Sequence, residues 1–133
     1  MGERREFWVE EEKTLYSVEW KLDDRGYVSD VRVERTHYPI HPYGNYVKDV
    51  AKIYWSSERP GAICIEVYRV KQSWGGTGRD DLLWLCFDDF SAETPWFLER
   101  SELEGITTAE CVKEYLRGVV QYVFSVLEES LGW

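Results

Sequence analysis

The stretch that decides the fold is TLYSVEWKLDDRGYVSDVRVER, residues 14–35. In its first half the large apolar residues Tyr16, Val18 and Trp20 share one face, and this period of two is typical of a half-buried β-strand. The turn signal DDRG follows, and the alternation then resumes with Val31 and Val33. We therefore predict a β-hairpin, which makes the sheet antiparallel.

Further strands are predicted on both sides of this hairpin, at residues 7–9, 47–55, 62–71 and 82–87. LLWLCF, residues 82–87, is apolar throughout, which is typical of a central strand buried on both faces. THYPIHPYGN, residues 36–45, is expected to be a loop because its prolines forbid regular ladder pairing. The glycine-rich QSWGGTGRDD, residues 72–81, is also expected to be a loop, and residues 90–105 to be irregular.

The C-terminal part of the chain predicts a helix over about residues 108–130. A capping box begins it, with Thr107 as the N-cap and Glu110 three residues later. The apolar arc of this helix is wider than one sheet contact needs, so either a curved sheet wraps it or its second side packs on another chain. The whole chain, residues 1–133, is thus predicted to be a single α+β domain: an antiparallel sheet of five to six strands packed on one long C-terminal helix.

Composition narrows the range of functions. The 133 residues include 25 acidic and 16 basic ones, a net charge of −9, which argues against binding to nucleic acid or to an anionic membrane. No apolar run approaches the ~20 residues of a membrane span, and the charged N-terminus is unlike a secretory signal. Cys64, Cys86 and Cys111 lack metal-site spacing and are expected to be free thiols in a reducing compartment. These features predict a cytoplasmic protein.

The negative charge is concentrated in residues 80–104, where eight acidic residues stand against Arg100 alone. Trp20, Trp55 and Trp84 lie in predicted strands and are expected in the core, whereas Trp74 and Trp96 lie in predicted loops. Aromatic and arginine side chains are typical anchors of protein interfaces, and carboxylates steer a basic partner. We predict a partner-binding surface of Trp74, Arg79, Asp80, Asp81, Asp88, Asp89, Glu93, Trp96, Glu99, Glu102 and Glu104. A merely solvated acidic surface is the alternative.

Three other motifs carry weaker signals. The glycine-rich loop lacks the Lys-Ser/Thr end of a phosphate-binding loop. His37 and His41 have a zinc-like spacing but lie among prolines, without a third ligand nearby. Asp88 and Asp89 with Glu93 have the chemistry of a magnesium or acid–base site, yet no complementary motif accompanies them. We therefore predict no catalytic residue, no metal site and no cofactor, and the chain is less typical of an enzyme than of a binding protein.

Two functions follow as hypotheses. The first is a small acidic binding or inhibitor protein that occludes a basic, nucleic-acid-processing partner, as immunity proteins and phage anti-defence proteins do; this is a likeness of composition to a functional class. The alternative is a small-molecule-binding or enzymatic α+β domain with an aromatic-lined pocket between sheet and helix. A cavity of several hundred cubic ångströms with convergent polar groups would favour the alternative. A homodimer formed through the C-terminal helix is compatible with the first.

Overall fold

The computed structural model describes residues 2–38, 45–88 and 95–131. Within these ranges six strands precede two short helical segments and a C-terminal helix: β1 (Gly2–Val9), β2 (Thr14–Leu22), β3 (Val28–His37), β4 (Tyr46–Trp55), β5 (Ile63–Ser73), β6 (Gly76–Phe87), the 3-10 helix η1 (Trp96–Leu98), α1 (Arg100–Glu104) and α2 (Ala109–Leu131). The predicted α+β class is confirmed. The helical segments η1 and α1 lie in the region that was expected to be irregular.

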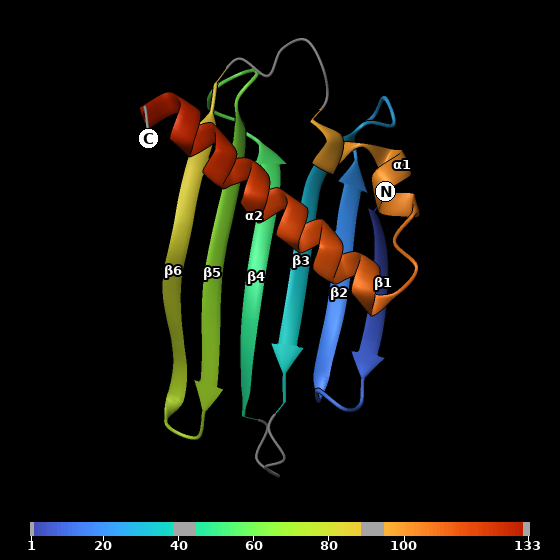
Figure 1. The fold of residues 1–133 in the computed structure, drawn as a ribbon, viewed down its shortest axis with the longest axis vertical. Coiled ribbons are helices and arrows are strands. Elements are labelled where there is room, and N and C mark those ends of the chain that lie inside the picture. The colour runs from blue at the N-terminus through green and yellow to red at the C-terminus, as the bar shows by residue number, and fades with distance from the viewer. Residues whose placement is uncertain (1, 39–44, 89–94, 132–133) are drawn as a thin grey trace.

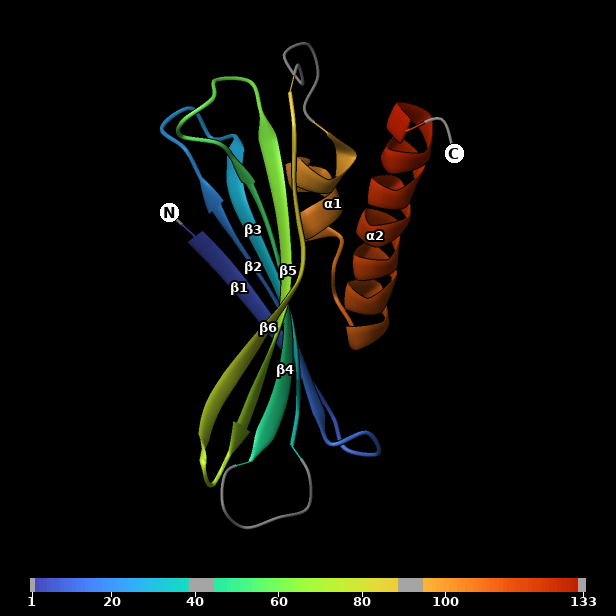
Figure 2. The ribbon, with the colours of Figure 1, turned by 90° about the vertical axis from the view of Figure 1, so that its left-hand side faces the viewer.

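Each strand pairs antiparallel with its neighbour in the sequence, so the sheet order is β1-β2-β3-β4-β5-β6 (Figure 1). The register aligns Val18, Val33, Ala51, Val67 and Leu83 in one row across five strands. Because side chains alternate between the faces of a strand, this row gives one face of the sheet an apolar surface. The helical segments all lie on that face of the twisted sheet, and the described part of the chain leaves the opposite face uncovered (Figure 2).

Helix α2 crosses the covered face diagonally, from β1 towards β6 (Figure 1). Thr108 is its N-cap, because the Thr108 hydroxyl accepts a hydrogen bond from the backbone N–H of Cys111. The predicted cap, Thr107, is therefore one residue early. No helix in the described ranges is long and apolar enough to cross a membrane.

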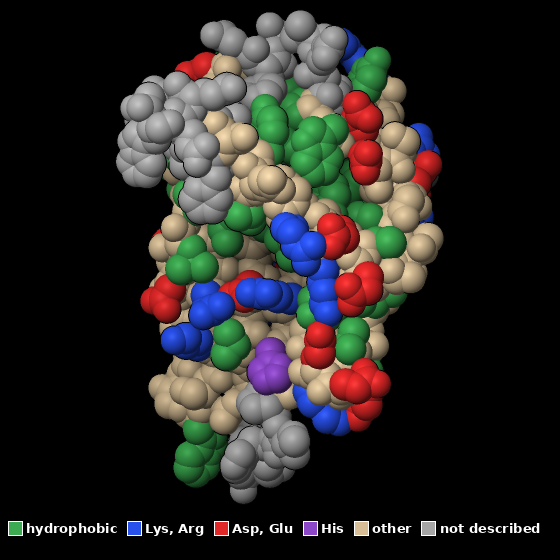
Figure 3. All heavy atoms as spheres, viewed as in Figure 1, with side chains coloured by type: hydrophobic (Ala, Val, Ile, Leu, Met, Phe, Trp, Pro, Cys, Tyr) green, Lys and Arg blue, Asp and Glu red, His purple; other side chains and the backbone are tan. Residues whose placement is uncertain are grey.

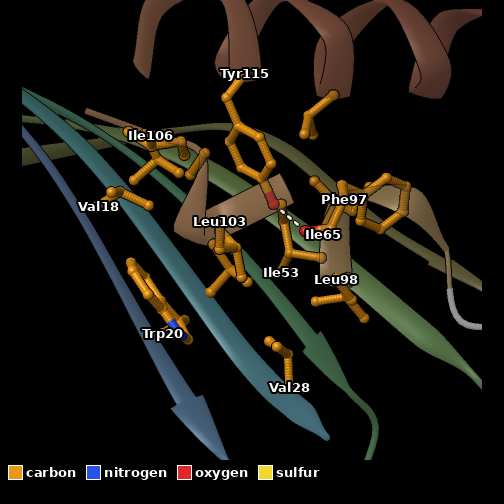
Figure 4. Close-up of a cluster of buried hydrophobic side chains, with 14 of the residues drawn as sticks. Val18, Trp20, Val28, Ile53, Ile65, Phe97, Leu98, Leu103, Ile106 and Tyr115 are labelled. Carbon is orange, nitrogen blue, oxygen red and sulfur yellow. Dashed lines mark hydrogen bonds between the residues drawn. The ribbon is translucent and has the colours of Figure 1, made fainter. Parts of the chain in front are cut away.

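The core lies between the sheet and the helical layer (Figure 4). On α2 its buried residues are Val112, Tyr115, Val119 and Val123, which recur at helical spacing on one side. Phe97, Leu98 and Leu103 fill the space between α2 and the strands, and all three are fully buried. The hydroxyl of Tyr115 donates a hydrogen bond to the backbone carbonyl of Phe97, which ties α2 to η1.

The β5–β6 hairpin corrects two predictions. Ser73 pairs with Gly76, so only Trp74 and Gly75 connect the strands, and most of the expected glycine-rich loop is strand. Strand β6 is an edge strand rather than a central one. Its inward residues pack against the core, but the apolar side chain of Trp84 faces away from α2 and is 64% exposed. An apolar run does not reveal that a strand has a partner on one side only.

The cysteines correct a third prediction. Cys64 of β5 and Cys86 of β6 are directly opposite in the register and form a disulfide on the uncovered face of the sheet. Cys111, at the start of α2, remains a free and half-buried thiol. Disulfides are typical of oxidising compartments and of intracellular proteins from hyperthermophiles. The sequence analysis inferred a reducing compartment from three free thiols. Because two of the three cysteines are paired, that argument no longer holds.

Candidate functional site

The first predicted partner-binding residues lie on the β5–β6 hairpin. Trp74 is in its turn and is 88% exposed. The Arg79 guanidinium carbon lies 3.8 Å from the ring centroid of Tyr68, and its nitrogens form ion pairs with Glu66 and Asp81. Asp80 and Asp81 belong to strand β6 rather than to a loop and are both exposed. Arg79 is thus held against the uncovered face of the sheet.

The next predicted residues lie at the opposite end of β6. Asp88 follows this strand and forms an ion pair with Arg59, whereas Asp89 and Glu93 lie outside the described residues. Trp96 begins η1, and its ring makes edge contacts with Phe97 and Tyr115. The Trp96 side chain is half-buried beneath α2, so its main contacts are within the fold.

Glu99, Glu102 and Glu104 are exposed in and just before α1, and Glu104 pairs with Arg100. Helix α1 and the β5–β6 hairpin lie at opposite ends of the molecule (Figures 1 and 2). Those of the predicted residues that the structure describes are therefore not gathered on one surface. They are divided between the hairpin and the end that carries α1.

A different cluster of charged residues lies on the covered face of the sheet, where the sequence analysis did not predict a site. Arg35, Asp49 and Arg69 follow one another across β3, β4 and β5 in register, two residues beyond the apolar row of Val33, Ala51 and Val67. The Nε atoms of Arg35 and Arg69 each lie 2.7 Å from a different carboxylate oxygen of Asp49. We refer to these three residues as the Asp49 cluster.

The Asp49 cluster lines an open groove between α2 and the sheet, with a volume of about 430 Å³. Tyr16 of β2 and Lys113 and Arg117 of α2 complete its polar lining. Viewed from the α2 side, Lys and Arg side chains form a band across this face, and the surface is hollowed there (Figure 3). We call this feature the α2 groove. It concentrates positive charge in a protein whose net charge is −9.

The other end of the α2 groove is apolar. It is lined by Ala51, Val67, Leu82, Leu116 and Val120. Leu82 reaches it through a β-bulge, since β6 has one residue more than β5 where Val67 pairs with Leu83 and Tyr68 with Asp81. Bulges re-aim side chains in this way. The α2 groove thus joins a charged part, formed on the sheet by Arg35, Asp49 and Arg69 of β3–β5, to an apolar part, formed there by Ala51, Val67 and Leu82 of β4–β6.

The charges in the α2 groove stabilise one another. Burial disfavours ionised Asp49, but hydrogen bonds from Arg69 and Arg35 outweigh this effect and lower the pKa of the Asp49 carboxyl. Hydrogen bonds to Glu12 and Glu110 raise the pKa of Lys113. Burial and the neighbouring Glu12 carboxylate raise the pKa of the Tyr16 hydroxyl. At neutral pH the Asp49 cluster therefore holds two positive charges and one negative charge.

A signal for this site is present in the sequence. Arg35, Asp49 and Arg69 each fall in phase with the apolar side of their strands, next to Val33, Ala51 and Val67. A charged residue on the core face of a strand is unexpected unless it is paired or lies at the rim of the core. The missing information was the register, which brings the three side chains together.

Comparison with known proteins gives no further guide: no protein-family model, no curated protein and no solved structure matches this chain.

Proposed function

We propose that this protein binds a small ligand and that the α2 groove is its binding site. The observation that carries the proposal is an open groove of about 430 Å³ in which an arginine–carboxylate cluster and an apolar wall meet. Ligand sites are typically concave, on the order of 300–1,000 Å³, and combine apolar lining with a few oriented polar groups. The α2 groove has this size and this combination.

The lining of the α2 groove differs from the aromatic-lined pocket considered in the sequence analysis. Among its lining residues only Tyr16 is aromatic, and the remaining apolar contacts are aliphatic. The groove also explains why the apolar arc of α2 is wide. Val112 and Val119 face the core, whereas Leu116 and Val120 face the groove. The second side of the arc thus has a role that needs no second copy of the chain, and dimerisation through α2 stays a prediction.

Occlusion of a basic partner protein also stays a prediction. The acidic residues assigned to it that the structure describes lie in two groups, one near the β5–β6 turn and one at the end that carries α1 (Figure 1). Asp81, Asp88 and Glu104 already have arginine partners within the chain. A partner would have to use one end alone or span the whole length of the sheet, so the α2 groove offers the more coherent site.

Titration with N-phenylnaphthylamine, a neutral probe whose fluorescence rises in apolar surroundings, tests the proposal. We expect saturable binding to the unmodified protein. Val120→Trp fills the apolar end of the groove and should weaken binding by about tenfold or more, since the loss of ~1.4 kcal/mol of contact corresponds to tenfold. Gln121→Trp is the matched control, because Gln121 is the next residue on α2 and is exposed outside the groove.

Two results would overturn the proposal. One is the absence of saturable binding by the unmodified protein up to the solubility limit of the probe. The other is equal binding by the Val120→Trp and Gln121→Trp variants, which would locate the probe elsewhere. Circular dichroism of both variants shows whether the fold is retained.

A further inference from the structure

We infer that the ligand of the α2 groove is an amphipathic monocarboxylate, whose carboxylate lies against Arg35 and Arg69 and whose apolar tail lies along the β5–β6 end. This inference rests on the proposed function and specifies the chemistry of the ligand. Three observations carry it: the charge of the Asp49 cluster, the hydrogen-bond donors of its arginines, and the apolar wall beside it.

The charges of the lining fit an anion better than a cation. Four basic side chains, Arg35, Arg69, Lys113 and Arg117, line the groove beside one carboxylate, that of Asp49. Three of the four have further carboxylates outside the lining, since Asp80 lies opposite Arg69 in the register and interacts with it electrostatically, Lys113 pairs with Glu12 and Glu110 and Arg117 pairs with Glu114. Arg35 has only the Asp49 carboxylate, which it shares with Arg69, so a monoanion that contacts Arg35 meets the least compensated cation of the groove, whereas a dianion would bring a second negative charge against Asp49.

The arginines retain donors for a second carboxylate. Asp49 receives hydrogen bonds from Nε of Arg35 and from Nε and Nη2 of Arg69. Each guanidinium has five N–H groups, and among the described residues these two side chains make no other hydrogen bond. Carboxylates are suited to such a pair because they accept two parallel N–H donors. Arg35 is about half exposed, so a ligand in the groove can reach it.

The apolar wall accounts for the tail. Val67, Leu82, Leu116 and Val120 adjoin the Asp49 cluster on the side of β5 and β6. Leu82 is 57% exposed and Val120 is 38% exposed. Covering these surfaces with an alkyl or aryl group removes apolar area from water, which is favourable. An anion without an apolar part would leave this end of the groove empty.

Displacement of N-phenylnaphthylamine by three ligands with the same tail tests the inference. We expect decanoate to bind about tenfold or more tightly than decanol, since hydrogen bonds to charged groups are the stronger ones. Decylammonium should bind more weakly than decanol, because its headgroup would lie against the guanidinium groups of Arg35 and Arg69. Added salt should weaken the binding of decanoate and leave the binding of decanol unchanged.

Variants locate the carboxylate. Arg35→Gln should bring decanoate affinity close to that of decanol and leave decanol unchanged. Arg32→Gln is the matched control, since Arg32 lies on the same strand but on the opposite face, where it pairs with Glu34. Asp49→Asn removes the competing carboxylate and should increase decanoate affinity several-fold, a gain that a damaged fold does not produce.

The outcomes separate this inference from the proposed function. If the neutral probe binds in the groove but decanoate binds no better than decanol, the groove is a ligand site and the inference is wrong. The inference is also wrong if Arg35→Gln and Arg32→Gln change the affinity for decanoate equally, or if Asp49→Asn lowers that affinity. If the probe itself does not bind, the proposed function fails first.

Discussion

Arg5 lies over the ring of Trp20, with its guanidinium carbon 5.3 Å from the ring centroid. Nη1 of the same guanidinium donates hydrogen bonds to the backbone carbonyls of Glu104 and Ile106. The first carbonyl belongs to the last residue of helix α1 and the second lies just beyond it, about a hundred residues later in the chain than Arg5. One side chain of the first strand thus joins the rim of the core to the connection between α1 and α2.

Replacing Arg5 by alanine should therefore destabilise the protein. We expect a loss of about 2–3 kcal/mol in the free energy of unfolding, because the carbonyls lose a charged donor and Trp20 loses its cover. Arg4→Ala is the control: Arg4 lies on the opposite face and makes ion pairs with Glu6 and Glu19 that are largely exposed, and such pairs contribute about 0–1 kcal/mol. Urea denaturation measures both, and equal losses would contradict the role given to Arg5.

Gly118 of α2 is packed against Trp96. A β-carbon at this position would lie 2.8 Å from Cη2 of the Trp96 ring, which is itself held between Phe97 and Tyr115. Alanine is normally favoured over glycine within a helix by about 1 kcal/mol. Here we expect the reverse, with Gly118→Ala destabilising by about 1–2 kcal/mol through overpacking.

A double-mutant cycle tests the cause of this effect. In a Trp96→Leu background the ring is gone, so Gly118→Ala should become neutral or stabilising when unfolding is followed in urea. A destabilisation of the same size in both backgrounds would show that Trp96 is not the obstacle. The cycle would also give the coupling free energy between Trp96 and position 118.

The Cys64–Cys86 disulfide should contribute to stability. It closes a loop across the β5–β6 hairpin with a sequence separation of 22, and links of this kind typically contribute about 2–4 kcal/mol. We expect the Cys64→Ala, Cys86→Ala double variant to lose about that amount, and Cys111→Ala to change little. Alkylation of the denatured, unreduced protein should modify Cys111 alone. Modification of all three cysteines would contradict the pairing.

Stability should fall at high pH because of Tyr115. Burial raises the pKa of this hydroxyl far above its usual value near 10. Above pH ~10 the unfolded state loses the phenolic proton while the folded state keeps it, so the free energy of unfolding decreases as pH rises. Below pH ~10 the Tyr115 hydroxyl keeps its proton in both states, so its contribution to the free energy of unfolding is fully present.

Urea melts at a series of pH values from about 8 to 11 measure this dependence, and Tyr115→Phe provides the comparison. This variant loses the hydrogen bond to Phe97 at every pH, but it should show a shallower decline of stability above pH ~10. Identical slopes for the two proteins would assign the alkaline sensitivity to other groups.

The hairpin at residues 14–35 and the helix near residues 109–131 could be predicted because their signals are local. Alternation of side chains in β2 and β3 and helical spacing in α2 follow from the backbone period alone. The edge position of β6 could not be predicted in this way. Leu82 and Trp84 are as apolar as core residues, and only the pairing order shows that β6 has a strand on one side alone in the described part of the chain.

The α2 groove depends on information that no single segment contains. Arg35, Asp49 and Arg69 are separated by 14 and 20 residues in the chain, and only the register of three strands brings them together. The acidic segment shows the opposite case. Asp80 and Glu102 belong to the same acidic stretch of the sequence, but strand β6 runs along the sheet between them, so the two residues lie at opposite ends of the molecule.

The order of the elements along the chain sets the order in which the molecule can be completed. The meander needs only neighbouring strands, so each hairpin can form as soon as its second strand has been synthesised. The apolar face of the sheet, however, is covered by α2, which follows all six strands in the chain, and Arg5 has both of these carbonyl partners only after residue 106 has been added. A growing chain therefore carries an uncovered apolar sheet until α2 has been synthesised, and this is the interval in which aggregation competes with folding.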